Sequence, residues 1–356
     1  MVRKHAAPAI CFIRANSELT GGAEIYLSRL VGALEQRGIA LTLLHSPLPR
    51  ATPSWLGALL FNLLLCLRKK RRFYFSLERI TCPDVYRAGD GVHRCYLQLE
   101  KKVPINPLHP VYLFLEKHCF RNAVMIIANS RMVKQQIIDT YRIPAAKIAV
   151  VYNGIPPVSE DFVVPRTFFE EFSLTGEEKV VLFVGSGFRR KGVIEFLEMF
   201  ARLQTPSIRA FVVGRDKKSR YYSQVAERLG LGKRVVFTGA RSDVANFYAV
   251  ADLLLLPTRY DPFANVTLEA MSHQTAVITT RQNGAHEILD SVFVMDHSRD
   301  YCITAVIDEL LQDSDKLTAV KKRNWEISRR FSLERNVEET MLVVAEARLS
   351  LTTGRQ

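Results

Sequence analysis

The chain of 356 residues is 48% apolar and 24% charged, a composition typical of soluble globular proteins, and its length predicts two domains. The longest apolar stretch, residues 55–67, is shorter than the roughly 18 residues of a membrane span, and the six cysteines form no CxxC pair, which indicates free thiols in a reducing cytoplasm. The net charge of +13 lies wholly in residues 1–156, where 22 Lys and Arg face nine Asp and Glu, so we expect this half to meet a phosphorylated ligand, an anionic membrane or a nucleic acid.

In the first half, apolar runs alternate with helical patterns, which predicts a parallel sheet wrapped by helices. The helix expected at 54–67 is apolar on nearly all faces, which favours burial, although the basic residues behind it also suit an interfacial helix. Residues 96–120, with the pair Lys101-Lys102 and several aromatic residues, are the better candidate for facing a membrane. We predict strands at 9–13, 39–44, 73–77, 84–87, 124–128 and 148–151, and helices at 23–36, 54–67, 108–120 and 130–141.

The segment Asn153–Pro157 interrupts this alternation, which restarts near residue 180 and ends in a final helix at 333–349. We therefore expect an N-terminal Rossmann-like domain, a linker with one short helix, and a C-terminal Rossmann-like domain. Two doubly wound domains of this kind hold ligands at the carboxyl ends of their strands, in a cleft between the domains. The expected bounds are 1–156, 157–178 and 179–332, and the second set of strands is at 180–184, 211–213, 235–237, 253–256, 276–279 and 292–294.

A glycine-rich basic loop, Gly185–Gly192, directly follows the strand at 180–184. Its glycines, including Gly185, allow a phosphate to approach the backbone. Its three cations would open the next helix, where the helix dipole disfavours them, and a bound diphosphate accounts for them through charge-assisted contacts. Arg190 and Lys191 are the main candidates for this role; the alternative is a solvated helix start.

An earlier glycine pair, Gly21 and Gly22, opens the helix at 23–36. Backbone N–H groups at a helix N-terminus attract a phosphate, so these glycines are candidates for the same ligand. A plain glycine turn is the alternative.

Two carboxylates, Asp261 and Glu269, flank a Pro-Phe-Ala-Asn turn after the strand at 253–256. Glu269 has apolar neighbours, and a carboxylate in that setting usually has a partner. Ribose hydroxyls would suit Glu269 and a sugar would suit Asp261, so cations and carboxylates together point to a nucleotide sugar. The alternative is a turn aspartate and a surface glutamate. The turn adds four residues to the candidate site: Phe263, Ala264, and Asn265 and Val266 with their backbone N–H groups.

Two further aspartate motifs are weaker evidence for a functional site. Asp90 lies between glycines just past a predicted strand and is placed to reach a cleft, with His93 and Arg94 as polar neighbours; a turn aspartate is the alternative. Asp313-Ser314-Asp315 matches the DxD pattern of metal-dependent sugar transferases, but its place between two helices favours a helix cap. We predict no metal.

Four motifs spread over nearly the whole chain carry a resemblance to a known family. They are Gly21–Glu24, Asn153–Ile155, Gly185–Gly192, and the Asp261 and Glu269 carboxylates separated by seven residues. The chain resembles the retaining GT-B glycosyltransferases of family 4 (glycosyl transferase group 1), and within them the lipopolysaccharide-core glucosyltransferase I group.

Three positions of the chain bear on this resemblance. Asp90 stands where many relatives have a His and the core-glucosyltransferase group has an Asp. Asp261 replaces the usual Glu and is one methylene shorter, and Ala264 replaces the usual Gly. Both replacements touch contacts to the donor sugar, so they bear on which sugar is used.

The resemblance implies two Rossmann-like domains with a C-terminal helix that crosses back to the first. It also implies a metal-independent enzyme, without cofactor, on the cytoplasmic face of the inner membrane. We expect it to transfer a hexose, glucose from UDP-glucose, to the phosphorylated lipopolysaccharide inner core with retention. The catalytic candidates are Asp90, Arg190, Lys191 and Asp261. Arg190, Lys191 and Asp261 are also candidates for binding the donor, together with the glycines and the turn residues named above. The candidates for binding the acceptor are Asp90, His93 and Arg94.

Other interpretations stay open. The acceptor could instead be an O-antigen, a capsule or a glycolipid. A nucleic-acid-binding protein would explain the basic half, but no aromatic–basic cluster or known module supports it. A nicotinamide enzyme would need a GxGxxG motif with an acidic residue about 20 positions on, which the sequence lacks.

Overall fold

The computed structural model describes residues 9–16, 22–49, 51–70, 72–100, 106–159 and 161–353, except for the side chain of Ala23. The chain forms two compact units. The first contains the residues up to Gly154 and those from Leu333 onward, and the second runs from Ile155 to Ser332. The stretch 157–178, expected as a linker, falls in the second unit and holds the short helix α6 (Arg166–Phe172).

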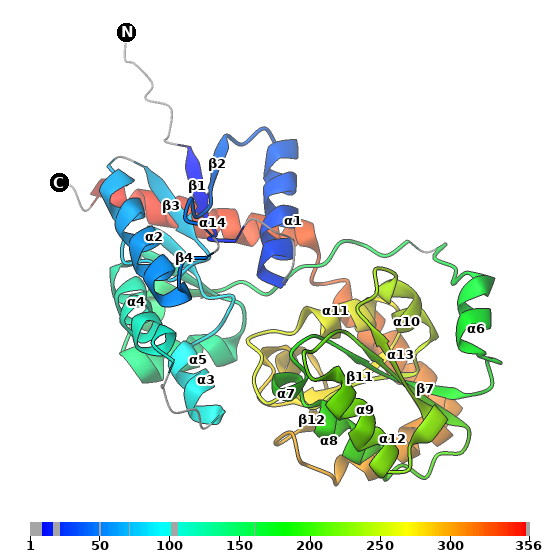
Figure 1. Ribbon diagram of the computed structural model, residues 1–356. Coiled ribbons are helices and arrows are strands. Elements are labelled where there is room, and N and C mark those ends of the chain that lie inside the picture. The colour runs from blue at the N-terminus through cyan, green and yellow to red at the C-terminus, as the bar shows by residue number, and fades with distance from the viewer. Residues whose placement is uncertain are drawn as a thin grey trace. The chain divides into compact units, whose positions relative to one another are not determined.

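The first unit is a six-stranded parallel sheet covered by helices, as the alternating pattern predicts (Figure 1). Its strand order is β2-β1-β3-β4-β5-β6. The strands are β1 (Ile10–Ile13), β2 (Leu41–Leu44), β3 (Phe73–Ser76), β4 (Val85–Arg87), β5 (Met125–Ala128) and β6 (Ile148–Val150), and the helices are α1 (Gly22–Gln36), α2 (Ser54–Arg68), α3 (His93–Leu99), α4 (Leu108–Asn122), α5 (Arg131–Tyr141) and α14 (Leu333–Thr353).

The C-terminal helix α14 packs into the first unit, as expected. Val337 and Val344 are buried in the same apolar cluster as Leu30 of α1 and Phe12 of β1. Figure 1 shows this red helix among the blue strands and helices of the unit. The side chain of Asn336 also donates a hydrogen bond to the carbonyl of Tyr152 (2.6 Å). The first unit therefore needs the last segment of the chain to complete its core.

The second unit is also a six-stranded parallel sheet, with strand order β12-β11-β10-β7-β8-β9. The four leucines of β10 are completely buried, as an interior strand of a parallel sheet requires. Besides α6, its strands are β7 (Lys179–Val184), β8 (Ile208–Val213), β9 (Val235–Gly239), β10 (Leu253–Leu256), β11 (Ala276–Thr280) and β12 (Val294–Met295), and its helices are α7 (Phe188–Lys191), α8 (Val193–Phe200), α9 (Ser219–Arg228), α10 (Val244–Val250), α11 (Asn265–Ser272), α12 (Ile303–Gln312) and α13 (Ser314–Ser328).

Strand order fixes where each unit can hold a ligand. In the first unit the order reverses between β1 and β3, and in the second it reverses between β7 and β10. Helices leave the two strands at such a point toward opposite faces, which opens a crevice at their carboxyl ends. Each unit therefore has one crevice of this kind, beside the residues that follow those strands.

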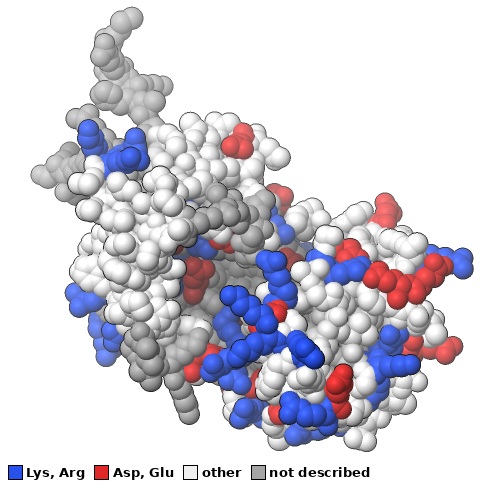
Figure 2. Space-filling model, viewed as in Figure 1, with Lys and Arg blue, Asp and Glu red and all other residues white. Residues whose placement is uncertain are grey.

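Helix α2 is less buried than its composition suggests. It buries Phe61 and Leu65, whereas Leu63 and Leu67 are 53% and 68% exposed. Figure 2 shows the surface over this helix almost free of Lys, Arg, Asp and Glu. The prediction of a buried helix is wrong because α2 lies on the outside of the unit, packed against α4 on one side. Among the described residues, no helix is long and apolar enough to cross a membrane.

Candidate functional site

The basic loop of the second unit follows β7 and forms the one-turn helix α7. Gly192 ends this helix at φ +83°, and a Cβ there would lie 2.0 Å from the carbonyl oxygen of Pro257, so glycine is required. The cations Arg189, Arg190 and Lys191 thus occupy the C-terminal end of α7, where a helix favours positive charge. The sequence predicts that these cations open the next helix; that helix is only the single turn α7, and α8 begins after Gly192. Figure 2 shows basic side chains gathered over this part of the second unit.

Lys191 and Arg190 converge on Asp261, which follows β10 across the crevice. The Asp261 Oδ2 atom lies 2.7 Å from Lys191 Nζ and 2.8 Å from Arg190 Nη1. Burial alone would raise the pKa of Asp261, but the charges of and hydrogen bonds from Lys191 and Arg190 lower it to about 2. Burial, together with Arg190, lowers the pKa of Lys191 despite the attraction of Asp261. Three of the predicted site residues are therefore brought together as a compact ion cluster.

The turn that carries Asp261 is held in place by the chain after β11. Asp261 N–H donates to Gln282 O (2.8 Å), and Gly284 N–H donates to Asp261 O (2.9 Å). The buried side chain of Asn283 accepts the N–H of Ala264 at Oδ1 (3.0 Å). Asn283 thus positions the site, and the sequence did not single it out because it lies 22 residues beyond Asp261 with no motif of its own.

Glu269 has a protein partner, as its apolar neighbours indicate. The hydroxyl of Tyr248 donates to Glu269 Oε2 (3.0 Å), and burial together with the Glu269 charge raises the pKa of Tyr248. Glu269 also attracts Lys191 electrostatically, which places it near the ion cluster. Phe263 and Ala264 are buried, so their backbone is what they can offer a ligand. Asn265 and Val266 open α11, as predicted.

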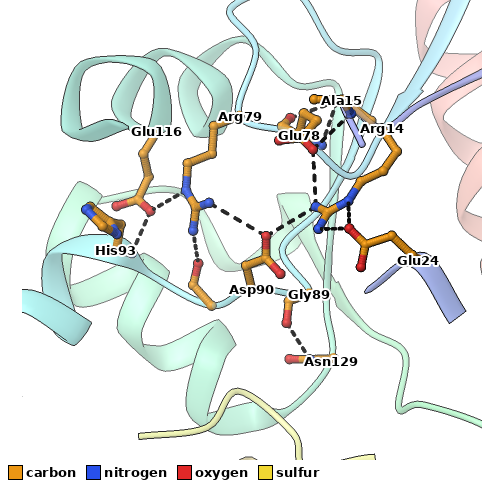
Figure 3. A network of polar contacts seen from close by, with 12 residues as sticks. Arg14, Ala15, Glu24, Glu78, Arg79, Gly89, Asp90, His93, Glu116 and Asn129 are labelled. Atoms are coloured by element: carbon orange, nitrogen blue, oxygen red, sulfur yellow. Dashed lines mark hydrogen bonds and ion pairs between the residues drawn. The ribbon is translucent and has the colours of Figure 1, made fainter. Parts of the chain in front are cut away.

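In the first unit, Asp90 lies at the centre of a network of charged side chains (Figure 3). Its Oδ2 atom is 3.4 Å from Arg14 Nη1 and 3.8 Å from Arg79 Nη1. Burial opposes ionisation of Asp90, but these two arginines lower its pKa. The Asp90 side chain is still 39% exposed, so a ligand can reach it.

Three glutamates complete this network. Arg14 Nη2 pairs with Glu24 Oε1 (2.8 Å), and Arg79 Nε pairs with the fully buried Glu116 at Oε2 (3.1 Å). Glu78 Oε1 accepts the N–H of Ala15 (3.0 Å) and lies 3.3 Å from Arg14 Nη1. Apart from Glu24, which ends the Gly21–Glu24 motif, sequence reasoning missed these residues. Asp90 is selected as a polar residue just past a strand, and the same rule also selects Arg14 after β1, and Glu78 and Arg79 after β3.

The remaining predicted residues of the first unit lie around this network. The backbone N–H groups of His93 and Arg94 both donate to Glu116 (2.6 and 3.3 Å), and His93 Nε2 lies 3.1 Å from His109 Nδ1. Gly22 begins α1 and is exposed, with open space where a Cβ would be. Gly21 lies outside the described residues.

The aspartates at 313 and 315 lie at the start of α13. Asp313 caps α13 by accepting the N–H of Lys316 (2.9 Å), the predicted role. Within the described ranges, no three His, Cys, Asp or Glu residues lie close enough together to hold a metal. A cavity of about 850 Å³ in the second unit is lined by the segment from Ile155 and by α13, and contains neither the basic loop nor Asp261. We place the site at the crevice, where charge and strand order coincide.

Sequence comparisons match the two halves of the chain to two family models. Residues 20–158 match Glycosyltransferase Family 4, and residues 165–326 match Glycosyl transferases group 1. The lipopolysaccharide glucosyltransferase WaaG of Escherichia coli K12 is 41% identical over 223 residues, covering 58% of this chain and 59% of that protein. An uncharacterized glycosyltransferase, MJ1607 of Methanocaldococcus jannaschii, is 28% identical over 46% of this chain and 44% of its own length. The chain thus aligns with about half the length of these curated relatives.

Solved structures match the fold over nearly the whole chain. The crystal structure of WaaG, a glycosyltransferase involved in lipopolysaccharide biosynthesis, has a TM-score of 0.80 at 21% identity, covering 93% of this chain and 98% of that one. Anabaena Alr3699/HepE in complex with UDP-glucose has a TM-score of 0.72 at 19% identity, covering 95% and 99%. The predicted fold, two Rossmann-like sheets of the GT-B type, is confirmed.

Proposed function

This chain belongs to glycosyltransferase family 4, the group 1 glycosyltransferases, and from that premise we propose that it transfers a hexose from a nucleotide sugar to a saccharide hydroxyl. The observation that carries the proposal is the ion cluster of Lys191, Arg190 and Asp261 at the crevice of the second unit. Two cations and a carboxylate side by side match the diphosphate and the hydroxyls of one nucleotide-sugar molecule.

The donor would bind by an exchange of charge partners. In the structure, Asp261 pairs with both cations, so one negative charge is shared between two positive ones. An arriving diphosphate replaces that carboxylate on Lys191 and Arg190, and the released Asp261 accepts hydroxyls of the donor sugar. As the bond between the anomeric carbon and the diphosphate breaks, negative charge grows on the leaving group, and the two cations stabilise it from fixed positions.

Cationic side chains would here do the work that a divalent metal does in other transferases, so the proposed reaction is metal-independent. Glu269 would bind the ribose, exchanging its Tyr248 hydroxyl for ribose hydroxyls.

We propose UDP-glucose as the donor, the phosphorylated lipopolysaccharide core as the acceptor, and retention at the anomeric carbon. The named relative is a lipopolysaccharide glucosyltransferase, and a solved structural neighbour holds UDP-glucose.

The acceptor would be lipid-linked, and α2 supports a peripheral place on the cytoplasmic face of the inner membrane. Leu60, Leu63 and Leu67 lie three and four residues apart and form one exposed apolar stripe. Exposed Arg68 and Lys70 follow at the end of this stripe. An apolar stripe with basic residues beside it suits an anionic bilayer surface.

The proposal is tested by measuring the binding of UDP-, GDP-, ADP- and dTDP-sugars by calorimetry, with EDTA present. We expect one UDP-hexose to bind selectively, and a slow hydrolysis of it to follow. If none of these compounds binds, the protein is not a transferase of this kind.

A further inference from the structure

The crevice of the first unit contains a cavity of about 430 Å³. It lies where the strand order reverses, beside the residues that follow β1, β2 and β3, and it is closed by α2 and α4. Position and size are those of a small-molecule site in a doubly wound sheet. None of the predicted acceptor-binding residues, Asp90, His93 and Arg94, lines it.

The charges around this cavity argue against an anionic ligand. Glu78 and Arg79 are the charged side chains among its described lining residues. Arg79 is already paired with Glu116 and Asp90, and Arg14 behind it is paired with Glu24, Glu78 and Asp90. Two guanidinium groups therefore face four carboxylates, and a phosphate entering here would meet excess negative charge.

Glu78 is the acidic hydrogen-bond acceptor among the described side chains that line the cavity. Its Oε1 atom is used by Ala15 N–H and Arg14, but Oε2 makes no hydrogen bond to any residue that the structure describes. Its side chain is 20% exposed, and burial together with the charge of Asp90 raises its pKa despite Arg14. A carboxylate in this setting gains from donors such as hydroxyl groups.

Part of the lining of the cavity is apolar and aromatic. Phe61 of α2 and Leu115 of α4 are buried there, and the ring of Tyr112 lies beside Arg79, whose guanidinium carbon is 5.4 Å from the ring centroid. A sugar ring has apolar C–H faces and a rim of hydroxyl donors, and this cavity presents surfaces for both.

We infer that this cavity binds an uncharged sugar ring of the acceptor, with Glu78 accepting a hydroxyl and Phe61 and Tyr112 packing against the ring. The inference rests on the proposed function and gives the acceptor site its chemical class. Phosphate groups of the acceptor would then stay outside, near the exposed cations that follow α2.

A larger side chain placed in the cavity tests whether the cavity binds a sugar ring, and it does so without removing a charged residue. Gly57 lines the cavity within α2, and a Cβ there meets only Thr52 Cγ2 at 3.8 Å, so Gly57→Leu fits the helix and fills the space. Gly32→Leu is the matched control, because a Cβ on that α1 glycine meets nothing within 4 Å.

The probe is the oligosaccharide released from lipopolysaccharide core and enzymatically stripped of phosphate, titrated into the full chain with and without UDP. Wild type and Gly32→Leu should bind the oligosaccharide. Gly57→Leu should lower the affinity for it by about tenfold or more, as expected when a sugar ring loses its pocket. Glu78→Gln should lower the affinity for the oligosaccharide by roughly tenfold, because a charged hydrogen-bond acceptor is lost.

Binding of UDP to the second unit should be the same in all four proteins, which separates this inference from the proposed function. Absence of UDP binding in wild type would count against the proposed function alone. The inference is overturned by any of three results: no oligosaccharide binding to wild type, equal binding to Gly57→Leu, or displacement of the oligosaccharide by millimolar inorganic phosphate.

Discussion

Lys191 Nζ and Asp261 Oδ2 lie 2.7 Å apart, and each side chain is about nine-tenths buried, although the two residues are 70 positions apart in the chain. The sheet brings them together because β7 and β10 are neighbours at the point where strand order reverses. A buried cation with a carboxylate partner is not free to bind an anion, so Asp261 competes with any phosphate for Lys191.

Removing that competitor should strengthen the binding of UDP. Asp261→Asn keeps the shape of the side chain but frees both cations, so we expect UDP to bind about tenfold more tightly by calorimetry, while transfer from the UDP-sugar becomes slower. Asp290→Asn, which breaks an exposed pair with Arg323, is the control and should change neither. Weaker UDP binding by Asp261→Asn would contradict the exchange of charge partners.

The same ion cluster gives a stability that depends on pH. Because the pKa of Asp261 is lowered in the folded protein to about 2, its contribution is complete above its ordinary value near 3.8 and is lost as the pH falls toward 2. The shift corresponds to roughly 2 kcal/mol. Urea unfolding at a series of pH values should therefore show wild type losing its advantage over Asp261→Asn between pH 4 and 2. A difference that stays constant over this range would argue against the pairing.

Lys191 should matter more for turnover than its neighbour Arg189. Lys191→Ala removes a fixed charge beside the leaving diphosphate and should lower kcat by about 100-fold or more. Arg189 is exposed and has no contact with Asp261 in the structure, so Arg189→Ala should stay close to wild type. Steady-state kinetics on the two variants make the comparison, and equal losses would mean that general positive charge, not position, is what the loop provides.

Two glycines of the basic loop should differ in what they tolerate. Both have positive φ, but a Cβ at Gly192 would strike Pro257 O at 2.0 Å, whereas one at Gly187 meets nothing within 4 Å. Gly187→Ala should cost about 1 kcal/mol of stability from backbone strain alone, and Gly192→Ala considerably more. Denaturant unfolding of both variants measures this, and similar costs would show that the Pro257 contact is unimportant.

The exposed stripe of α2 should bind bilayers that carry negative charge. Leu63→Glu with Leu67→Glu should abolish binding to anionic liposomes, while Leu342→Glu, at a 70% exposed position on α14, should not. Wild-type binding should weaken with added salt and be absent from neutral liposomes. Flotation assays make the comparison, and equal binding by the double variant would remove α2 from the membrane contact.

The sequence predicted the architecture well because alternating apolar runs and glycine loops are local signals. It also singled out Arg190, Lys191 and Asp261 for one site, since each follows a recognisable strand, but it did not predict that the two cations pair with Asp261. It failed for the network around Asp90, because its members come from three separate segments and none carries a distinctive spacing: Arg14, the pair Glu78 and Arg79, and Glu116. Glu116 in particular looks like an ordinary helical surface residue, yet it is completely buried between Arg79 and Tyr141.

The position of α14 has a consequence for biosynthesis. Because the ribosome makes the chain from its N-terminus, the continuous segment Ile155–Ser332 can fold before synthesis ends. The first unit cannot, since Val337 and Val344 reach its core only when α14 has emerged as well. The half of the protein that is translated first is therefore finished last, and a truncated chain that ends near residue 332 would have a complete second unit beside an open first one.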